Sequence, residues 1–307
     1  MNELACHVED YLSLRRALGF KLAREGQVLP QLVAYLNDAG ATTLTAELAI
    51  AWAQLPVGVH PVTWTQRLGA ARGFATYLKT IDPATEIPAR DVFAGQGKRP
   101  VPYLWSNHDI VRLLDAARQL QPPLKAATYQ TLFGLLAVSG MRISETLGLD
   151  RNDVDLADGV ITVAEGKFRR QRLIPVHPST TDALRTYAAD RDRMKPQPAT
   201  TAFFISWRGG TALGYSGVLG TFNLLTTEIG LRTRTVRPRI HDLRHSFAVR
   251  SLTEWHRAGV DVAGRMAVLA DYLGHVNPAG TYWYLSASPE LMELAAARLD
   301  GQFGGGR

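Results

Sequence analysis

The stretch that divides the larger part of the chain into two helical segments reads Ser139-Gly140-Met141-Arg142-Ile143-Ser144-Glu145. An apolar segment over residues 124–138 precedes it and predicts a long buried helix. Gly140 is expected to end this helix, because glycine adopts the left-handed conformation found at many helix C-termini. A second, amphipathic helix then begins after Arg142. A cation is unfavourable at the positive N-terminal end of a helix, and a bound anion would remove the repulsion. Arg142 is therefore a candidate anion contact, although a solvated arginine at a helix start gives the same pattern.

The sequence on both sides of this stretch predicts a mainly helical domain with a small β element. Ser106 and Asp109 form a capping-box pattern at the start of a helix that runs to about residue 118. Residues 160–164 and 172–176 alternate between apolar and polar side chains, as the strands of a β-hairpin do. Further helices are expected over residues 181–191, 218–229, 240–257, 263–273 and 290–299. The predicted fold class is mainly α with a small β-sheet (α+β).

The first 97 residues predict four short helices that would form a small bundle. They cover residues 8–18, 24–37, a segment capped by Thr45, and residues 63–79. Prolines and glycines interrupt the pattern between residues 81 and 102, as in a linker. A chain of 307 residues allows two domains at about 150 residues each. We expect a helical domain over residues 1–95, a linker over 96–102 and a second domain over 103–307.

Positive charge is concentrated in the second part of the chain. The formal net charge is +6, and residues 1–97 contain 8 basic and 9 acidic residues, against 26 and 19 in residues 98–307. Most of the basic residues are arginines, which suit bidentate contacts with phosphate. A GC-rich genome would also favour arginine codons. The charge distribution therefore permits a polyanionic partner for residues 98–307.

The composition also excludes several classes of protein. The only cysteine is Cys6, which leaves no disulfide framework and no cysteine-ligated zinc or iron–sulfur site. No apolar run approaches the roughly 20 residues of a membrane-spanning helix, and the N-terminus shows no signal-peptide pattern. We therefore expect a cytoplasmic protein with no membrane partner.

Four short stretches carry side chains suited to chemistry on a phosphate. Besides the stretch around Arg142, they are Gly166-Lys167 between the two predicted strands, residues 241–245 (His-Asp-Leu-Arg-His), and Leu273-Gly274-His275 followed by Tyr284. The two histidines and the arginine of residues 241–245 share one helical face. A histidine pair at this spacing also occurs in zinc hydrolases, but those need a glutamate directly after the first histidine. Each stretch alone is equally typical of an ordinary surface, turn or core.

Together, the candidates form a set for phosphoryl transfer to a tyrosine hydroxyl. Fixed arginine and histidine donors stabilise the charge that develops on the non-bridging oxygens. A tyrosine needs a base or cationic surroundings to act as a nucleophile, and a lysine among other cations suits a general acid. No acidic cluster with metal-ligand spacing accompanies them, which disfavours two-metal nuclease chemistry. The candidate catalytic residues are Arg142, Lys167, His241, Arg244, His275 and Tyr284.

At these residues the sequence resembles the tyrosine recombinase (phage integrase) family over nearly its whole length. Residues 139–145 are similar to the family's first arginine motif, and residues 241–248 match its H-x-L-R-H-x-F-A box. Residues 166–175 resemble its hairpin-lysine motif, and residues 273–275 match its L-G-H box. The family's nucleophile normally lies nine residues beyond that histidine, at the position of Tyr284.

The segment before Tyr284 departs from the family pattern. Gly280-Thr281 stands where the family usually has two threonines, and Tyr282 supplies a second hydroxyl. The run Thr281–Leu285 also resembles recombinases carried by transposons and integrative elements. Spacing favours Tyr284 as the nucleophile, with Tyr282 as the alternative.

The resemblance implies a fold, partners and a reaction. Residues 1–95 would be a SAM-like core-binding domain and residues 103–307 the catalytic domain, and the two would clamp double-stranded DNA. The protein would act without a cofactor. It would bind two paired DNA sites as a homo-tetramer, with a dimer on each site. The resemblance leaves open whether a partner recombinase or accessory proteins take part. The expected phosphate contacts are Arg67, Arg72, Lys79, Arg169, Arg170, Arg172, Arg237 and Arg239.

The resemblance also implies a role for each catalytic candidate. Tyr284 would attack the scissile phosphate and form a 3′-phosphotyrosyl bond. Two arginines, Arg142 and Arg244, would hold the non-bridging oxygens, with His275 as a further donor. Lys167 would protonate the leaving 5′ oxygen, and His241 would assist as acid or base.

Two alternative functions are compatible with the same motifs. A type IB topoisomerase would use this chemistry to relax supercoils, and a non-catalytic relative would bind DNA without cleaving it. The motifs do not distinguish integration from excision, transposition or dimer resolution, and they do not specify the DNA target, the order of strand exchange or cleavage in cis or trans. The resemblance further predicts that a C-terminal helix containing Leu291, Leu294 and Leu299 packs on a neighbouring protomer.

Overall fold

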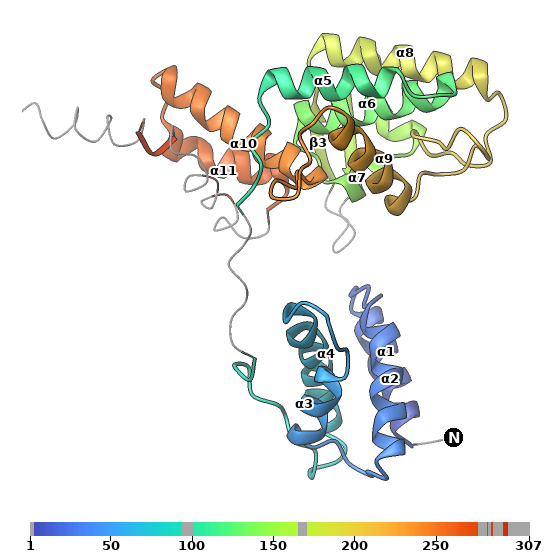
Figure 1. Cartoon of the computed structure of the whole chain (residues 1–307), viewed down its shortest axis with the longest axis vertical. Helices are drawn as coiled ribbons and strands as arrows, with labels where there is room; N and C mark the ends of the chain where they lie inside the picture. Colours follow the sequence, from blue (N-terminus) through green and yellow to red (C-terminus); the bar gives the residue numbers. More distant parts are fainter. Residues whose placement is uncertain are drawn as a thin grey trace, which may run out of the picture. The chain divides into compact units, whose positions relative to one another are not determined.

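The computed structural model describes residues 3–93, 101–164, 171–275, 281, 284 and 291–293. These residues fall into two compact units, one within the first 93 residues and one from residue 101 onward (Figure 1). Each unit has its own hydrophobic core. Within the described ranges, no helix combines the length and apolar character that crossing a bilayer requires.

The described part of the N-terminal unit consists of four helices, as the sequence predicts. They are α1 (Glu3–Ala17), α2 (Glu25–Asp38), α3 (Ala46–Gln54) and α4 (Val62–Leu78). α4 packs against each of the other three helices, and Leu36, Trp52 and Phe74 are buried between them. The predicted cap is confirmed, because the Thr45 side chain accepts a hydrogen bond from the backbone N–H of Leu48 (3.3 Å).

Arg67, which the sequence analysis assigned to the DNA backbone, is part of this core. It is only 8% exposed, and its guanidinium lies 4.0 Å from the centre of the Trp52 ring. The guanidinium also donates hydrogen bonds to the carbonyl oxygen of Trp52 (3.2 Å) and to Gln31 Oε1 (3.1 Å). Burial, and then the charge of Arg24, lower the pKa of Arg67. Stacking on Trp52 therefore takes the place of the expected phosphate contact.

Arg72 and Lys79 are the other two candidate phosphate contacts of this unit. Arg72 is half-buried in α4 and donates hydrogen bonds to the carbonyl oxygens of Pro88 (2.9 Å) and Ala89 (2.5 Å). Lys79 caps the C-terminus of α4 and is exposed. Arg72 thus fastens the segment after α4 to the helix, whereas the Lys79 side chain is available to solvent.

The described part of the larger unit confirms the predicted α+β class. Its helices are α5 (Asn107–Arg118), α6 (Pro123–Ser139), α7 (Ile143–Leu147), the 3₁₀ helix η1 (Arg151–Asp153), α8 (Pro178–Met194), α9 (Tyr215–Glu228), α10 (Ile240–Arg257) and α11 (Val262–Leu273). α6 packs against α5, α8 and α10 (Figure 1). The predicted capping box of α5 is confirmed: Ser106 Oγ accepts from the backbone N–H of Asp109 (3.1 Å), and the Asp109 carboxylate accepts from that of Ser106 (3.4 Å).

A small antiparallel sheet lies between α7 and α8 in the chain. It has the order β1 (Val154–Asp155), β2 (Val160–Ala164) and β3 (Gln171–Pro175). Ile161 of β2 stands opposite Ile174 of β3, and both are buried. The predicted hairpin is confirmed, whereas β1 was not predicted because two residues are too few to show alternation. β3 also contacts α11.

Gly140 ends α6 in the left-handed conformation that the sequence predicts, with φ of 62°. A Cβ atom at this position would lie 2.5 Å from Phe247 Cδ1 and 3.1 Å from Leu273 Cδ2. Because glycine has no side chain, α10 and α11 can approach the end of α6 closely. This approach brings together the segments that carry the arginine and histidine motifs.

We expect Gly140→Ala to lower the free energy of unfolding of the larger unit by about 2–5 kcal/mol, from left-handed strain and overpacking against Phe247. Gly230→Ala is the matched control. Gly230 also has a positive φ (74°), but no atom lies within 4 Å of its Cβ position. This variant should lose only about 1–2 kcal/mol. Urea unfolding measures both values, and equal losses would contradict tight packing at Gly140.

Candidate active site

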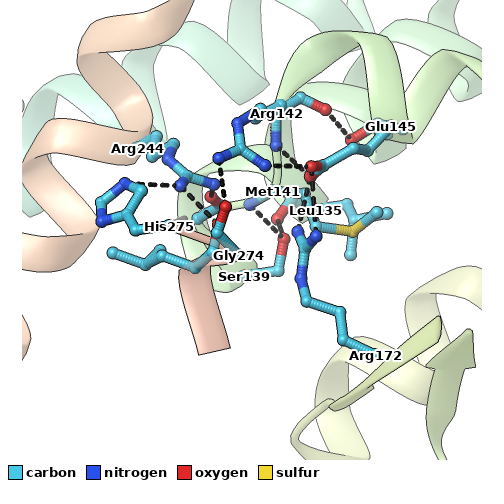
Figure 2. Close-up of polar contacts among 12 residues, drawn as sticks. Leu135, Ser139, Met141, Arg142, Glu145, Arg172, Arg244, Gly274 and His275 are labelled. Atoms are coloured by element: carbon cyan, nitrogen blue, oxygen red, sulfur yellow. Dashed lines mark hydrogen bonds and ion pairs between the residues drawn. The ribbon is translucent and has the colours of Figure 1, made fainter. Parts of the chain in front are cut away.

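Four segments that are far apart in the sequence meet at the end of α6 (Figure 2). They are the turn from α6 into α7, the first turns of α10, the turn after α11 and strand β3. These segments place Arg142, Arg244, His275 and Arg172 in one hydrogen-bonded group. The first three were expected to act together, and the structure brings them together.

Arg244 is the buried centre of this group. It is 2% exposed, and its guanidinium donates hydrogen bonds to the carbonyl oxygens of Gly140 (2.8 Å) and Leu273 (2.6 Å). A third hydrogen bond joins its Nη2 to Nε2 of His275 (3.0 Å). Burial, and then the charge of Arg142, lower the pKa of Arg244, although a guanidinium stays protonated at neutral pH. The result is a buried cation fixed to the C-terminal ends of α6 and α11.

Arg142 is held by a carboxylate and by a backbone carbonyl. Its Nη1 donates to Glu145 Oε1 (2.6 Å), its Nη2 donates to the carbonyl oxygen of Gly274 (2.5 Å), and its backbone N–H donates to Glu145 Oε2 (2.8 Å). Glu145 also accepts from Arg172 Nη2 (2.6 Å). One carboxylate therefore orders two arginines from different elements.

Glu145 is ionised in spite of its burial. Burial acts to raise the pKa of Glu145, but the hydrogen bonds from Arg172 and Arg142 outweigh it and hold this pKa below its ordinary value. The carboxylate therefore offsets part of the positive charge of the group at neutral pH.

The position of Arg172 differs from the expectation that it contacts the DNA backbone. Its side chain is 12% exposed and forms an ion pair with Glu145. The two residues are 27 positions apart, so no local sequence pattern indicates the pair. Arg172 thus supports Glu145, which holds Arg142.

His275 follows Gly274, whose left-handed conformation ends α11. Because a guanidinium can only donate hydrogen bonds, His275 Nε2 accepts from Arg244, and Nδ1 carries the proton that it donates to Thr281 Oγ1 (2.7 Å). Burial, followed by the charges of Arg244 and Arg142, lowers the pKa of His275 to about 4. The ring is therefore neutral at neutral pH, and its two partners set its tautomer.

Tyr284, the expected nucleophile, lies within this group. It is 2% exposed, and its side chain is hydrogen-bonded to Arg244. Its ring stacks on His275, with centroids 5.9 Å apart and 24° between the planes. It also meets His245 edge to face, with centroids 5.2 Å apart. The expected nucleophile therefore lies beside the cation that was expected to hold the phosphate.

His241, the expected acid or base, lies at the start of α10 with an exposed side chain. Its ring meets His245 at 87°, with centroids 4.7 Å apart. The groups packed around the His241 ring remove part of its hydration, and this desolvation lowers the pKa of His241; the charge of Arg244 lowers it further. His245 itself is 8% exposed, and burial, followed by the charge of His241, lowers its pKa to about 4.

Several expected site residues fall outside the part of the chain that the structure describes. They are the hairpin residues Lys167, Arg169 and Arg170, the alternative nucleophile Tyr282, and Leu294 and Leu299 of the expected C-terminal helix.

The two remaining candidate phosphate contacts lie just before α10. Arg237 is exposed. Arg239 has a side chain that is 42% exposed and forms an ion pair with Asp242 (2.7 Å). Among the residues with described positions, no group of three or more histidine, cysteine or acidic side chains could hold a metal ion.

Three residues of this group had no role in the sequence analysis: Glu145, His245 and Thr281. Glu145 lies three residues after Arg142, across the start of α7. This spacing is the signal that could have revealed the pair of Arg142 and Glu145. The contacts of His245 and Thr281 depend on where Tyr284 lies relative to α10 and where Thr281 lies relative to His275, which the sequence does not show.

Two histidines with lowered pKa values, His245 and His275, should make the protein less stable in acid. An imidazole in the unfolded chain has a pKa of about 6.5, whereas the pKa of His245 and that of His275 are lowered to about 4 in the folded protein. Between these values the unfolded chain binds more protons, so stability falls as the pH is lowered, by up to about 1.4 kcal/mol per pH unit for each group. We expect the double variant His245→Phe/His275→Gln to show a shallower slope of the free energy of unfolding against pH. Substitution of the exposed His108 is the control, and an unchanged slope in the double variant would contradict the buried neutral state.

Comparison with known proteins gives concordant results. The model of the phage integrase family matches residues 105–290. The chain is 41% identical over 300 residues to y4rB of Sinorhizobium fredii, which carries the name integrase/recombinase, and the match covers 95% of this chain and 96% of that protein. It is 28% identical to the tyrosine recombinase XerC of Proteus mirabilis, over 74% of this chain and 68% of the relative.

The fold is shared with solved recombinase structures. The integrase of the transposon Tn1549, solved in complex with transposon right end DNA, superposes with a TM-score of 0.68 at 18% identity, covering 97% of this chain and 99% of that one. The family match spans more than half of the chain and contains both arginines and the expected nucleophile. The chain belongs to the phage integrase family of tyrosine recombinases.

Proposed function

We propose that this protein is a site-specific DNA recombinase, which cleaves a DNA strand through a 3′-phosphotyrosyl intermediate and rejoins it to another strand. The observation that carries the proposal is the burial of Tyr284 against Arg244, within the group that also contains Arg142 and His275. Related structures support DNA as the partner, because XerH was solved bound to a difH substrate, the Tn1549 integrase in complex with transposon right end DNA, and lambda integrase bound to a core site.

In the cleavage step, Tyr284 Oη attacks the phosphorus of the scissile phosphodiester. A bond forms between phosphorus and Oη, and the bond to the 5′ oxygen breaks. Negative charge develops on the non-bridging oxygens, where Arg142 and Arg244 act as donors that are already in place before the phosphate arrives. We assign the proton for the leaving 5′ oxygen to Lys167 and the acceptance of the tyrosine proton to His241, on the basis of the family motifs.

The hydrogen bond between Arg244 and His275 supports a specific role for the histidine. A phosphate oxygen is a stronger acceptor for a guanidinium N–H than a neutral imidazole nitrogen, because the new bond is charge-assisted. The phosphate therefore replaces His275 Nε2 as the partner of Arg244 Nη2. A shift of the imidazole proton to Nε2 then lets His275 donate to a second phosphate oxygen.

Strand rejoining reverses the same step. The 5′-hydroxyl of a partner strand attacks the phosphotyrosyl phosphorus, the bond to Tyr284 breaks, and the tyrosine regains its proton. The energy of the phosphodiester bond is conserved, so no cofactor is needed. We assign this reaction to a homo-tetramer with a dimer on each of two DNA sites, and we place the protein in the cytoplasm.

We assign DNA binding to both parts of the chain. Residues 1–95 form the core-binding domain, residues 96–102 the linker, and residues 103–307 the catalytic domain. Lys79 in the first and Arg237 in the second are exposed cations suited to backbone phosphates. These contacts set affinity and salt dependence more than the choice of sequence.

The assignment of Tyr284 is tested by trapping the covalent intermediate. A binding site selected from random duplex DNA is rebuilt as a nicked suicide substrate, in which the released fragment diffuses away. Wild type should accumulate a protein–DNA adduct, and Tyr284→Phe should reduce its rate of formation by at least about 1,000-fold. Denaturing gels of the reaction measure the adduct.

Tyr282→Phe is the matched control, because it removes a hydroxyl from the same segment, and it should keep the adduct. An adduct that survives Tyr284→Phe would overturn the assignment of the nucleophile. Wild type that binds the site without forming any adduct would identify a non-catalytic relative, and relaxation of supercoils without recombinant product would identify a topoisomerase.

Substitution of Arg172 and substitution of Arg237 should affect different steps of the reaction. Arg172→Ala is expected to slow cleavage about 10- to 100-fold at saturating DNA, because Glu145 loses a partner and Arg142 is less well positioned. Arg237→Ala should instead weaken DNA binding and reduce the slope of log K against log salt by about 1. Titrations at several salt concentrations and single-turnover cleavage measure the two effects. If Arg172→Ala also reduced the slope of log K against log salt, Arg172 would be a contact to the DNA backbone, as the sequence analysis expected.

A further inference from the structure

Four rings form a continuous series of contacts across the candidate active site. His241 touches His245 (4.7 Å between centroids), His245 touches Tyr284 (5.2 Å), and Tyr284 touches His275 (5.9 Å). The mechanism proposed above uses three of these residues directly. His245 is the fourth, and it contacts both the nucleophile and the expected acid or base.

The contacts of His245 have the geometry of specific aromatic pairs. Its plane is at 87° to His241 and at 65° to Tyr284, so both contacts are edge to face. Such pairs prefer a defined orientation, because the positive edge of one ring meets the negative face of the other. A ring held between two others in this way restricts the rotation of both neighbours.

His245 differs from the other buried residues of α10. Leu243, Ala248 and Leu252 are buried in the hydrophobic clusters of the larger unit. His245 is also buried, at 8% exposure, but its ring neighbours are residues of the candidate active site. It is also neutral at neutral pH, since burial lowers its pKa to about 4, so it adds no further cation beside Arg142 and Arg244.

We propose that His245 is a positioning residue, which holds the rings of Tyr284 and His241 in a fixed relation through its two edge-to-face contacts. Tyr284 is thereby kept beside Arg244, where its oxygen meets the phosphate. The inference rests on the proposed function of Tyr284 and adds a residue that neither touches the phosphate nor exchanges a proton.

Two substitutions distinguish the effect of the aromatic ring of His245 from the effect of its nitrogen atoms. His245→Phe keeps a flat ring and both contacts but cannot exchange a proton, and it should cleave a nicked substrate within about threefold of the wild-type rate. His245→Leu fills a similar volume without a ring and should slow single-turnover cleavage roughly 10- to 100-fold, about the value of two aromatic contacts. DNA affinity should be unchanged in both variants, and His245→Phe should keep the wild-type dependence of the cleavage rate on pH.

Leu243→Ala is the control for a purely structural effect. Leu243 is 1% exposed in the same helix and belongs to the hydrophobic cluster that does not contain Tyr284, so its truncation destabilises the same unit without removing a ring from the site. It should cleave at close to the wild-type rate under conditions where it is folded. A rate as low as that of His245→Leu would show that any loss of packing in α10 slows the reaction, and would overturn the proposal.

The remaining outcomes are equally decisive. If His245→Phe is as slow as His245→Leu, or if its pH profile changes, then His245 acts through its nitrogens and the positioning role is wrong. If His245→Leu cleaves like wild type while Tyr284→Phe is inactive, this inference fails and the proposed function stands. If Tyr284→Phe still forms the adduct, the assignment of Tyr284 as the nucleophile fails, and the positioning role of His245 fails with it.

Discussion

The buried guanidinium of Arg244 is the interaction on which the larger unit depends. A charge removed from water is costly unless nearby groups compensate it. Here the compensation comes from the carbonyl oxygens of Gly140 and Leu273, which lie at the C-terminal ends of α6 and α11. Helix C-termini carry unpaired carbonyls and partial negative charge. The fold therefore directs two helix ends at one cation, and the rest of the site is arranged around this junction.

The charge balance of the site follows from this arrangement. Arg142, Arg172 and Arg244 lie close together, and Glu145 is the carboxylate that pairs with two of them. A group with more cations than anions attracts a polyanion and gains stability when a phosphate enters. Because His245 and His275 stay neutral, they add hydrogen-bonding or aromatic contacts without increasing the repulsion.

Local patterns predicted the parts of the structure that depend on neighbours in sequence. The capping box at Ser106, the cap at Thr45, the end of α6 at Gly140 and the two strands of the hairpin all follow from residues within one turn or one strand pair of each other. Family motifs then brought Arg142, Arg244, His275 and Tyr284 together, although composition and periodicity alone could not. The partners of two expected phosphate contacts were missed for one physical reason. Arg67 and Arg172 resemble free surface cations in sequence, but each pairs with a group 15 or 27 positions away, the carbonyl of Trp52 and the carboxylate of Glu145.

The acceptors of Arg142 and Arg244 also affect how this site can evolve. Three of their hydrogen bonds end on the backbone carbonyls of Gly140, Leu273 and Gly274. A point mutation replaces a side chain but leaves the carbonyl in the chain, so no single substitution deletes these acceptors. The arginines can thus keep their positions while the surrounding sequence drifts. Selection is then expected to act on the path of the backbone, and hence on the two left-handed glycines that end α6 and α11, more than on the residues that contribute the acceptors.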